Sequence, residues 1–216
     1  MVSMKILKLD GGHAFSRDDR AMAGANVEMK NVTNLDQYKL ATTDLTPYNV
    51  LVVTDFIDQE HLFENKEIIE RFLDDGKIVI ACTHIFRNWL SGINPFMPRT
   101  IRNHMDYEMK VTNMKSIFRG VDMLELAYRK GVSGFYARGY HPLANQEVEV
   151  HLAFLDGTPI TFVDRTTTKG TIVAHSGRDL LTYETGENST QLISKQTLEW
   201  IESELALLDR EKEILA

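Results

Sequence analysis

The residues with the clearest chemical potential surround Cys82, the single cysteine of the 216-residue chain. A thiol at a turn between a strand and a helix is activated when the helix N-terminus favours the thiolate and a histidine shares its proton. His175 follows another apolar segment and is a candidate for that base, with Asp179 as the acid that orients its ring. The predicted catalytic residues are therefore Cys82, His175 and Asp179.

A competing interpretation makes Cys82 a core residue, because free cysteine is among the most buried residue types. A nucleophile elbow places small residues around the nucleophile, as in the hydrolase pattern G-x-S-x-G. Here the neighbours are Ala81 and Thr83, and His84 stands where the second glycine would be. The missing glycines favour the core interpretation, and both interpretations stay open at this point.

A pair of glycines follows the first predicted strand, in the sequence Asp10-Gly11-Gly12-His13. Their backbone N–H groups could face an anion or an oxyanion, or the pair could simply turn the chain. The spacing matches neither G-x-G-x-x-G nor a P-loop, so we expect no nucleotide cofactor here. The histidines and acids nearby suit zinc or iron, but no H-x-x-x-H or C-x-x-C spacing supports a metal site. We expect neither a metal nor any other cofactor.

Three polar segments, 10–13, 82–84 and 175–179, each follow a predicted strand. Ligands of open parallel sheets collect outside the carboxyl ends of the strands, where such segments meet. We therefore expect a crevice at this edge. The predicted ligand-binding residues are Asp10, Gly11, Gly12, His13, His84 and Arg178.

The elements that must position these residues form a βαβ unit over residues 49–82. Residues 49–54 are apolar on both faces, which is typical of a central parallel strand covered by helices. Apolar residues recur at helical spacing over 59–74, and Gly76 occupies the place of a C-terminal helix cap. Residues 77–82 form the next strand, and the crossover should be right-handed.

The remaining elements are predicted from turns and periodicity. Strands are expected at 4–9, more weakly at 26–32, and at 170–175. Asp156-Gly157 predicts a hairpin between strands 147–154 and 158–163. Residues 91–145 are predicted to be irregular with short strands, and we interpret them as a variable lid or interface insertion. An amphipathic C-terminal helix over 189–208, within segment 188–210, could pack on its own sheet or on a second copy of the chain in a homo-oligomer.

The composition is 43% hydrophobic and 25% charged, which is typical of a soluble globular protein, and the length suits one domain over 1–216. The net charge of −7 argues against a nucleic-acid partner bound through its phosphates. No apolar run approaches the length of a membrane span, and the N-terminus lacks the pattern of a signal peptide. We expect a cytoplasmic protein with no membrane partner.

The run YNVLVVTDFIDQEHLFENKEIIERFLDDGKIVIACTH resembles the class I glutamine amidotransferase-like superfamily in its strand, acidic loop, helix and second strand. The later run KGTIVAHSGRDLLTYETG is similar to the trehalose-utilisation branch of that superfamily. The resemblance covers residues 4–82 and 157–204. It implies a single flavodoxin-like α/β domain with a mostly parallel sheet flanked by helices. For the amidotransferases proper it also implies Cys82 as nucleophile and His175 as base.

Both catalytic signatures of that superfamily are altered in this chain. Where the superfamily has G-x-C-x-G, this chain has Ile-Ala-Cys-Thr-His around Cys82. Where the superfamily has His-Pro-Glu, this chain has His-Ser-Gly beginning at His175, so Asp179 would have to take the role of the missing glutamate. In the trehalose-utilisation branch, the cysteine is not the expected catalytic residue. We therefore expect a catalytically degenerate amidotransferase-like domain that binds a small polar ligand or a partner protein. The alternative is a Cys82-dependent hydrolase or amidase that acts on a C–N bond with His175 as base.

Overall fold

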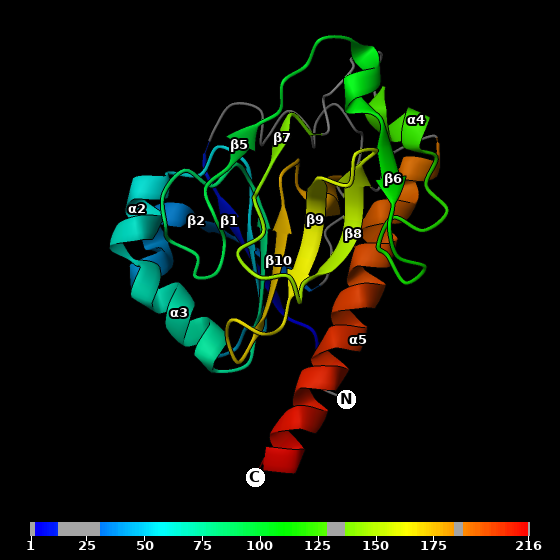
Figure 1. Ribbon diagram of the computed structural model, residues 1–216. Helices are drawn as coiled ribbons and strands as arrows, with labels where there is room; N and C mark the ends of the chain where they lie inside the picture. Colours follow the sequence, from blue (N-terminus) through cyan, green and yellow to red (C-terminus); the bar gives the residue numbers. More distant parts are fainter. Residues whose placement is uncertain (1–2, 13–30, 129–136, 184–187, 216) are drawn as a thin grey trace.

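The computed structural model describes residues 3–12, 31–128, 137–183 and 188–215 (Figure 1). In this part of the chain, an eight-stranded sheet has the order β2-β1-β3-β4-β10-β9-β8-β6. The first five strands of this order are parallel: β2 (Val32–Asp36), β1 (Ile6–Asp10), β3 (Val50–Val53), β4 (Ile78–Cys82) and β10 (Thr171–His175). They reproduce the flavodoxin-like order 2-1-3-4-5, which confirms the predicted α/β class.

Antiparallel strands extend the sheet beyond β10. These strands are β9 (Pro159–Asp164), β8 (Glu149–Phe154) and β6 (Met109–Val111). Gly157 has a φ of 92° in the turn between β8 and β9, a conformation that favours glycine, and the predicted hairpin is confirmed. A separate two-stranded sheet pairs β5 (Met97–Pro98) with β7 (Gly139–Tyr140).

The predicted helix 59–74 is instead two helices, α2 (Gln59–Glu64) and α3 (Lys66–Asp74). Asp58 begins α2 by accepting hydrogen bonds from the N–H groups of Glu60 and His61. Asn65 ends it, because its side-chain amide donates to the His61 carbonyl oxygen at 2.8 Å and competes with helix propagation. Gly76 follows α3 with a φ of 67°, as predicted for a cap.

Helices cover both faces of the sheet (Figure 1). Leu62 of α2 and Phe72 of α3 belong to the apolar cluster on one face, together with alternate residues of β3 and β4. The other face is covered by α5 (Leu192–Leu215), whose Ile193 and Ile201 join the second cluster. The apolar face of α5 thus packs on its own sheet. The helix also continues beyond the predicted end at 208.

The described part of segment 91–145 has the short strands that were predicted for it, and a short helix in addition. It contributes β6 to the main sheet and contains β5, β7 and the short helix α4 (Met123–Ala127). Short 3-10 helices connect other elements: η1 (Gln37–Thr42), η2 (His104–Tyr107), η4 (Leu180–Thr182) and η5 (Ser189–Gln191). The weaker strand predicted at 26–32 lies mostly outside the described residues, and β2 begins where it was expected to end. No helix of the described ranges is long and apolar enough to cross a membrane.

Candidate functional site

Cys82 and His175 are the last residues of the neighbouring parallel strands β4 and β10, and they are paired in register. Side chains in register on parallel strands point to the same face of a sheet. For Cys82 this face is the one covered by α5, since the residue shares an apolar cluster with Ile78 and Ile80. Both Cys82 and His175 are fully buried. Because Cys82 still belongs to the strand, it points into the layer between sheet and helix.

The surroundings of Cys82 favour the neutral thiol. Burial raises the pKa of Cys82 well above its usual value, and the carboxylate of Asp179 raises it further. A hydrogen bond from the backbone of Leu180 and the charge of Lys8 oppose this shift without cancelling it. The Cys82 side chain is therefore a protonated thiol at neutral pH.

His175 is held by a neighbouring strand. Its Nδ1 atom lies 2.7 Å from Oγ1 of Thr161 in β9, and both side chains are buried. The pKa of His175 is lowered to about 3, chiefly by burial and then by the nearby histidines His84 and His141, while a hydrogen bond with the Arg178 backbone opposes the shift. The ring is therefore neutral at physiological pH.

Asp179 has two partners, neither of which was predicted. Its carboxylate accepts a hydrogen bond from the Leu181 N–H at 2.9 Å and so caps η4. It also forms an ion pair with Nζ of Lys8, and both side chains are largely buried. The sequence did contain a hint of the Lys8 contact. Lys8 lies two residues after Ile6 in β1, so both side chains are on the same buried face, where a lysine needs a partner.

The glycine pair brings two turns close together. A Cβ atom at Gly11 would lie 2.8 Å from the carbonyl oxygen of Phe56, so only glycine allows the turns after β1 and β3 to approach this closely. The N–H of Gly12 donates to Oδ1 of Asp10 at 2.9 Å, and this donor is thus used within the turn. His13 lies outside the described residues.

Arg178 and His84 occupy different surroundings at the same edge. Nε of Arg178 lies 3.9 Å from Oδ2 of Asp55, which follows β3 and was missed by the sequence analysis. The ring of His84 stacks on Phe96 with centroids 3.8 Å apart, and burial lowers the pKa of His84. The edge therefore holds a partly exposed cation on one side and an aromatic stack on the other.

Three exposed aromatic residues surround the N-terminus of α2. Tyr38, Phe56 and Phe86 are 57%, 64% and 61% exposed, and we call them the aromatic edge. The Tyr38 hydroxyl donates to Asp58 at 3.0 Å, and the Phe86 N–H donates to the Gln59 side chain at 2.7 Å. Phe56 has a φ of 60°, which is unfavourable for a bulky residue. The sequence analysis did not single out these three residues.

No group of three histidine, cysteine or acidic side chains in the described part of the chain is arranged to hold a metal ion.

Comparison with known proteins extends the fold assignment. No protein-family model matches the chain, and no curated protein matches its sequence. A solved structure described as a component of GMP synthase from Thermoplasma acidophilum is similar over 100% of this chain and 99% of its own, with a TM-score of 0.53 and 11% identity. The mmIFT52 N-terminal domain is similar over 92% of this chain and 97% of its own, with a TM-score of 0.51 and 10% identity. At such identity the likeness shows the fold alone, a flavodoxin-like α/β sheet.

Proposed function

We propose that this chain is a binding module built on an amidotransferase-like fold, with Cys82 as a core residue and the aromatic edge as the docking surface for a partner protein. The observation that carries the proposal is the state of Cys82. The nucleophilic form of cysteine is the thiolate, and a fully buried side chain with a raised pKa is neither ionised nor accessible.

The partners of the other two predicted catalytic residues support the same proposal. The hydrogen bond with Thr161 restrains the ring of His175, and burial makes that ring a weak base. Asp179 is engaged by Lys8 and by the cap of η4. Each group thus has a structural role in the core that requires no substrate.

The aromatic edge supports protein binding, in place of catalysis by Cys82, as the function of this fold. Exposed aromatic rings are enriched at the energetic centres of protein interfaces. The three residues come from different connections of the chain. The Tyr38 hydroxyl is hydrogen-bonded to Asp58, which caps α2, and the Phe86 backbone is hydrogen-bonded to the side chain of Gln59, the first residue of α2, so both positions are held at the start of this helix. The backbone of Phe56 is held in an unfavourable conformation with its side chain exposed, and such strain is concentrated at functional positions.

A small polar ligand is the second candidate, because of Arg178. The side chains of Arg178 and Asp55 are 20% and 26% exposed, and Nε of Arg178 lies 3.9 Å from Oδ2 of Asp55. An anionic group of a ligand could take the place of Asp55 beside the guanidinium, which suits planar anions. This candidate uses the same edge of the sheet.

Thiol labelling of the native protein tests the state of Cys82. We expect iodoacetamide to react slowly, at a rate that follows unfolding in denaturant. Rapid labelling with an apparent pKa below the usual value of about 8.5 would overturn the core assignment. Hydrolysis of glutamine or another amide that Cys82→Ser abolishes would establish the alternative, a Cys82-dependent hydrolase.

Comparative affinity purification tests the partner. The tagged wild type, Cys82→Ser, Phe56→Ser and Phe86→Ser are used side by side on a lysate of the source organism. We expect a protein that wild type and Cys82→Ser retain and that both phenylalanine variants lose. Met114→Ser is the matched control, since Met114 is 92% exposed and lies in a different segment. Equal retention by all variants contradicts the aromatic edge as the docking surface.

A further inference from the structure

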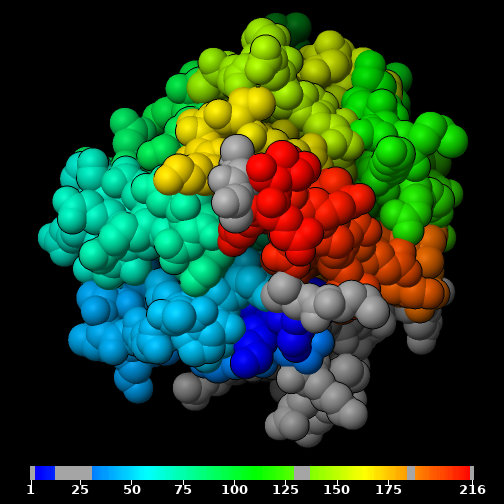
Figure 2. All heavy atoms as spheres, turned by 90° about the horizontal axis from the view of Figure 1, so that it is seen from below, coloured from blue at the N-terminus to red at the C-terminus, as the bar shows by residue number. Residues whose placement is uncertain are grey.

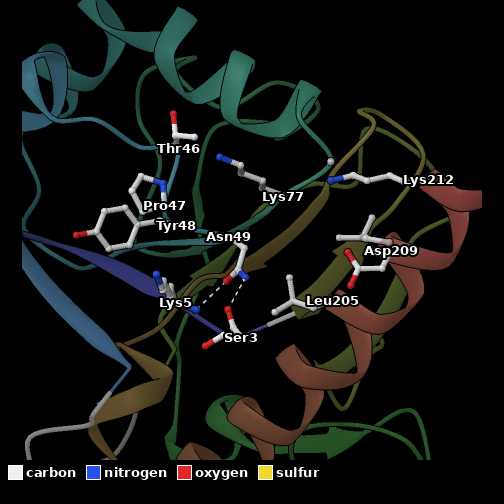
Figure 3. Close-up of a pocket in the computed structure, with 12 residues that line it drawn as sticks. Ser3, Lys5, Thr46, Pro47, Tyr48, Asn49, Lys77, Leu205, Asp209 and Lys212 are labelled. Carbon is white, nitrogen blue, oxygen red and sulfur yellow. Dashed lines mark hydrogen bonds between the residues drawn. The ribbon is translucent and has the colours of Figure 1, made fainter. Parts of the chain in front are cut away.

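A pocket of about 390 Å³ lies at the opposite end of the sheet from the aromatic edge (Figure 3). The residues that precede β1, β3 and β4 line one side of it, and the C-terminal half of α5 lines the other. Figure 2 views the molecule from this end, where the red end of α5 meets the blue and teal segments. The pocket has the volume of a typical small-molecule site.

The charged residues of the pocket are mostly lysines. Lys5, Lys77 and Lys212 line it, and Asp209 is the acidic residue in the lining, so the formal charge of the wall is +2. Lys5 and Lys212 form no ion pair in the described part of the chain. Lys77 has a nearby carboxylate, that of Asp75 at 3.7 Å. The ammonium of Lys77 also lies 4.8 Å from the centre of the Phe72 ring and interacts with the carboxylate of Asp44. In a chain with a net charge of −7, Lys5 and Lys212 therefore contribute most of the local positive charge that an anion would meet.

The positions of Lys77 and Lys212 at the pocket depend on contacts with neighbouring backbone. Nζ of Lys77 donates to the Leu45 carbonyl oxygen at 3.3 Å, and its side chain is only 14% exposed. A Cβ atom at Gly76 would lie 2.6 Å from Cε of Lys212, so the glycine leaves room for Lys212 to cross the turn. Figure 3 shows the Lys77 side chain extending toward Thr46 and the Lys212 side chain extending from α5 toward the segment before β4.

The rest of the wall has an apolar part beside the polar residues Ser3, Thr46 and Asn49. Tyr48 and Pro47 line it on the sheet side, and Leu205 and Leu208 line it on the α5 side. Asn49 shapes this wall, because its side chain accepts from the Lys5 N–H at 2.8 Å and donates to the Ser3 carbonyl oxygen at 3.0 Å. A ligand that fits both parts of the pocket therefore has an anionic group and an apolar body.

We propose that this pocket binds a small organic phosphate monoester, with the phosphate among Lys5, Lys77 and Lys212 and the apolar body against Tyr48 and Leu205. A phosphate monoester carries about −1.5 to −2 charges at pH 7, which matches the formal charge of the wall better than a single carboxylate does. Ammonium groups bind phosphate as point charges and need no bidentate geometry.

Calorimetric titration with three probes tests the proposal on the full chain. Phenyl phosphate offers both groups, inorganic phosphate offers the anion alone, and benzoate offers the ring with a single negative charge. We expect phenyl phosphate to bind most tightly and its affinity to fall as salt is added. Lys5→Gln and Lys212→Gln should each weaken binding about tenfold, as expected when one hydrogen bond to a charged group is lost.

Matched controls make the result decisive. Lys195→Gln, on the same helix as Lys212 but outside the pocket, should leave the affinity unchanged. Tyr48→Ala should weaken the binding of phenyl phosphate and leave the binding of inorganic phosphate unchanged. Circular dichroism checks that each variant is folded. The proposal is overturned if no probe binds at millimolar concentration, if Lys195→Gln weakens binding as much as Lys212→Gln, or if benzoate binds as tightly as phenyl phosphate.

Discussion

Thr161 and His175 face each other across the antiparallel pair β9 and β10, with 2.7 Å between the threonine hydroxyl oxygen and Nδ1 of the imidazole. Neither side chain is exposed. The contact gives a buried polar ring a partner inside the core, and it fixes the orientation of that ring beside Cys82. In this protein, the histidine expected to serve as a base is thus part of the packing between the sheet and α5.

Removal of the Thr161 hydroxyl tests this role. Thr161→Val keeps the shape of the side chain and leaves Nδ1 of His175 without this partner, so we expect a loss of about 1–3 kcal/mol in the free energy of unfolding. Urea denaturation measures the loss. Thr161→Ser keeps the hydroxyl and should be less destabilising than Thr161→Val, and the reverse order would show that the hydrogen bond contributes little.

The lowered pKa of His175 predicts a loss of stability in acid. The pKa of His175 is about 3 in the folded chain and about 6.5 in the unfolded chain. Between these two pH values the unfolded state binds a proton that the native state does not bind, so acid favours unfolding. The contribution of the neutral ring is complete above pH 6.5 and is lost as the pH falls toward 3. Over this whole pH range, the loss in the free energy of unfolding due to His175 is on the order of 5 kcal/mol.

A substitution isolates this effect from that of other groups. His175→Asn cannot titrate, so its free energy of unfolding should fall less between pH 6.5 and 4 than that of the wild type. Thermal unfolding at a series of pH values provides the comparison. Parallel curves for the two proteins would contradict the assignment of the lowered pKa to His175.

The ion pair of Lys8 with Asp179 should be stabilising only as a pair. Lys8→Met leaves the buried carboxylate of Asp179 without its cation, and we expect destabilisation by about 3–5 kcal/mol. The double variant Lys8→Met with Asp179→Asn removes both charges and keeps a side chain that can cap η4, so it should recover much of the loss. Guanidinium denaturation of the single and double variants measures the coupling, and additive losses would exclude it.

The contact of Arg165 with Glu204 should anchor α5 on the sheet. Nε and Nη2 of Arg165 donate to the two carboxylate oxygens of Glu204 at 2.7 and 2.8 Å, and the Thr171 hydroxyl donates to the same carboxylate at 2.7 Å. Glu204 is almost completely buried. Glu204→Ala removes all three hydrogen bonds, and we expect destabilisation by about 3 kcal/mol or more.

The exposed end of the same helix provides the control for Glu204. Glu211→Ala lies on α5 and is exposed, so it should change the free energy of unfolding by less than about 0.5 kcal/mol. Hydrogen exchange adds a local measure, because amides of α5 should lose protection in Glu204→Ala before those of β3 do. Equal protection of α5 in wild type and Glu204→Ala would contradict the anchoring role.

Local sequence pattern determined the elements at the centre of the fold. The apolar runs that became β3 and β4 are buried on both faces, and such runs are stable only between two layers of helices. Asp156-Gly157 predicted the hairpin correctly, because the turn needs a residue with positive φ and Gly157 provides it. The division of 59–74 at Asn65 was less predictable, because it depends on one side-chain hydrogen bond.

The tertiary structure decided what the candidate site contains. The sequence by itself placed Cys82, His175 and Asp179 at one edge, because parallel strands carry their carboxyl ends together. It predicted that strands end at Cys82 and at His175, but it could not determine that the two residues are paired in register and that Cys82 faces α5. A shift of one residue would have turned the thiol to the opposite face, and register depends on packing across the whole sheet. The partners Lys8 and Thr161 come from distant parts of the chain, so only the folded arrangement could assign the ion pair and the hydrogen bond that keep these groups in the core.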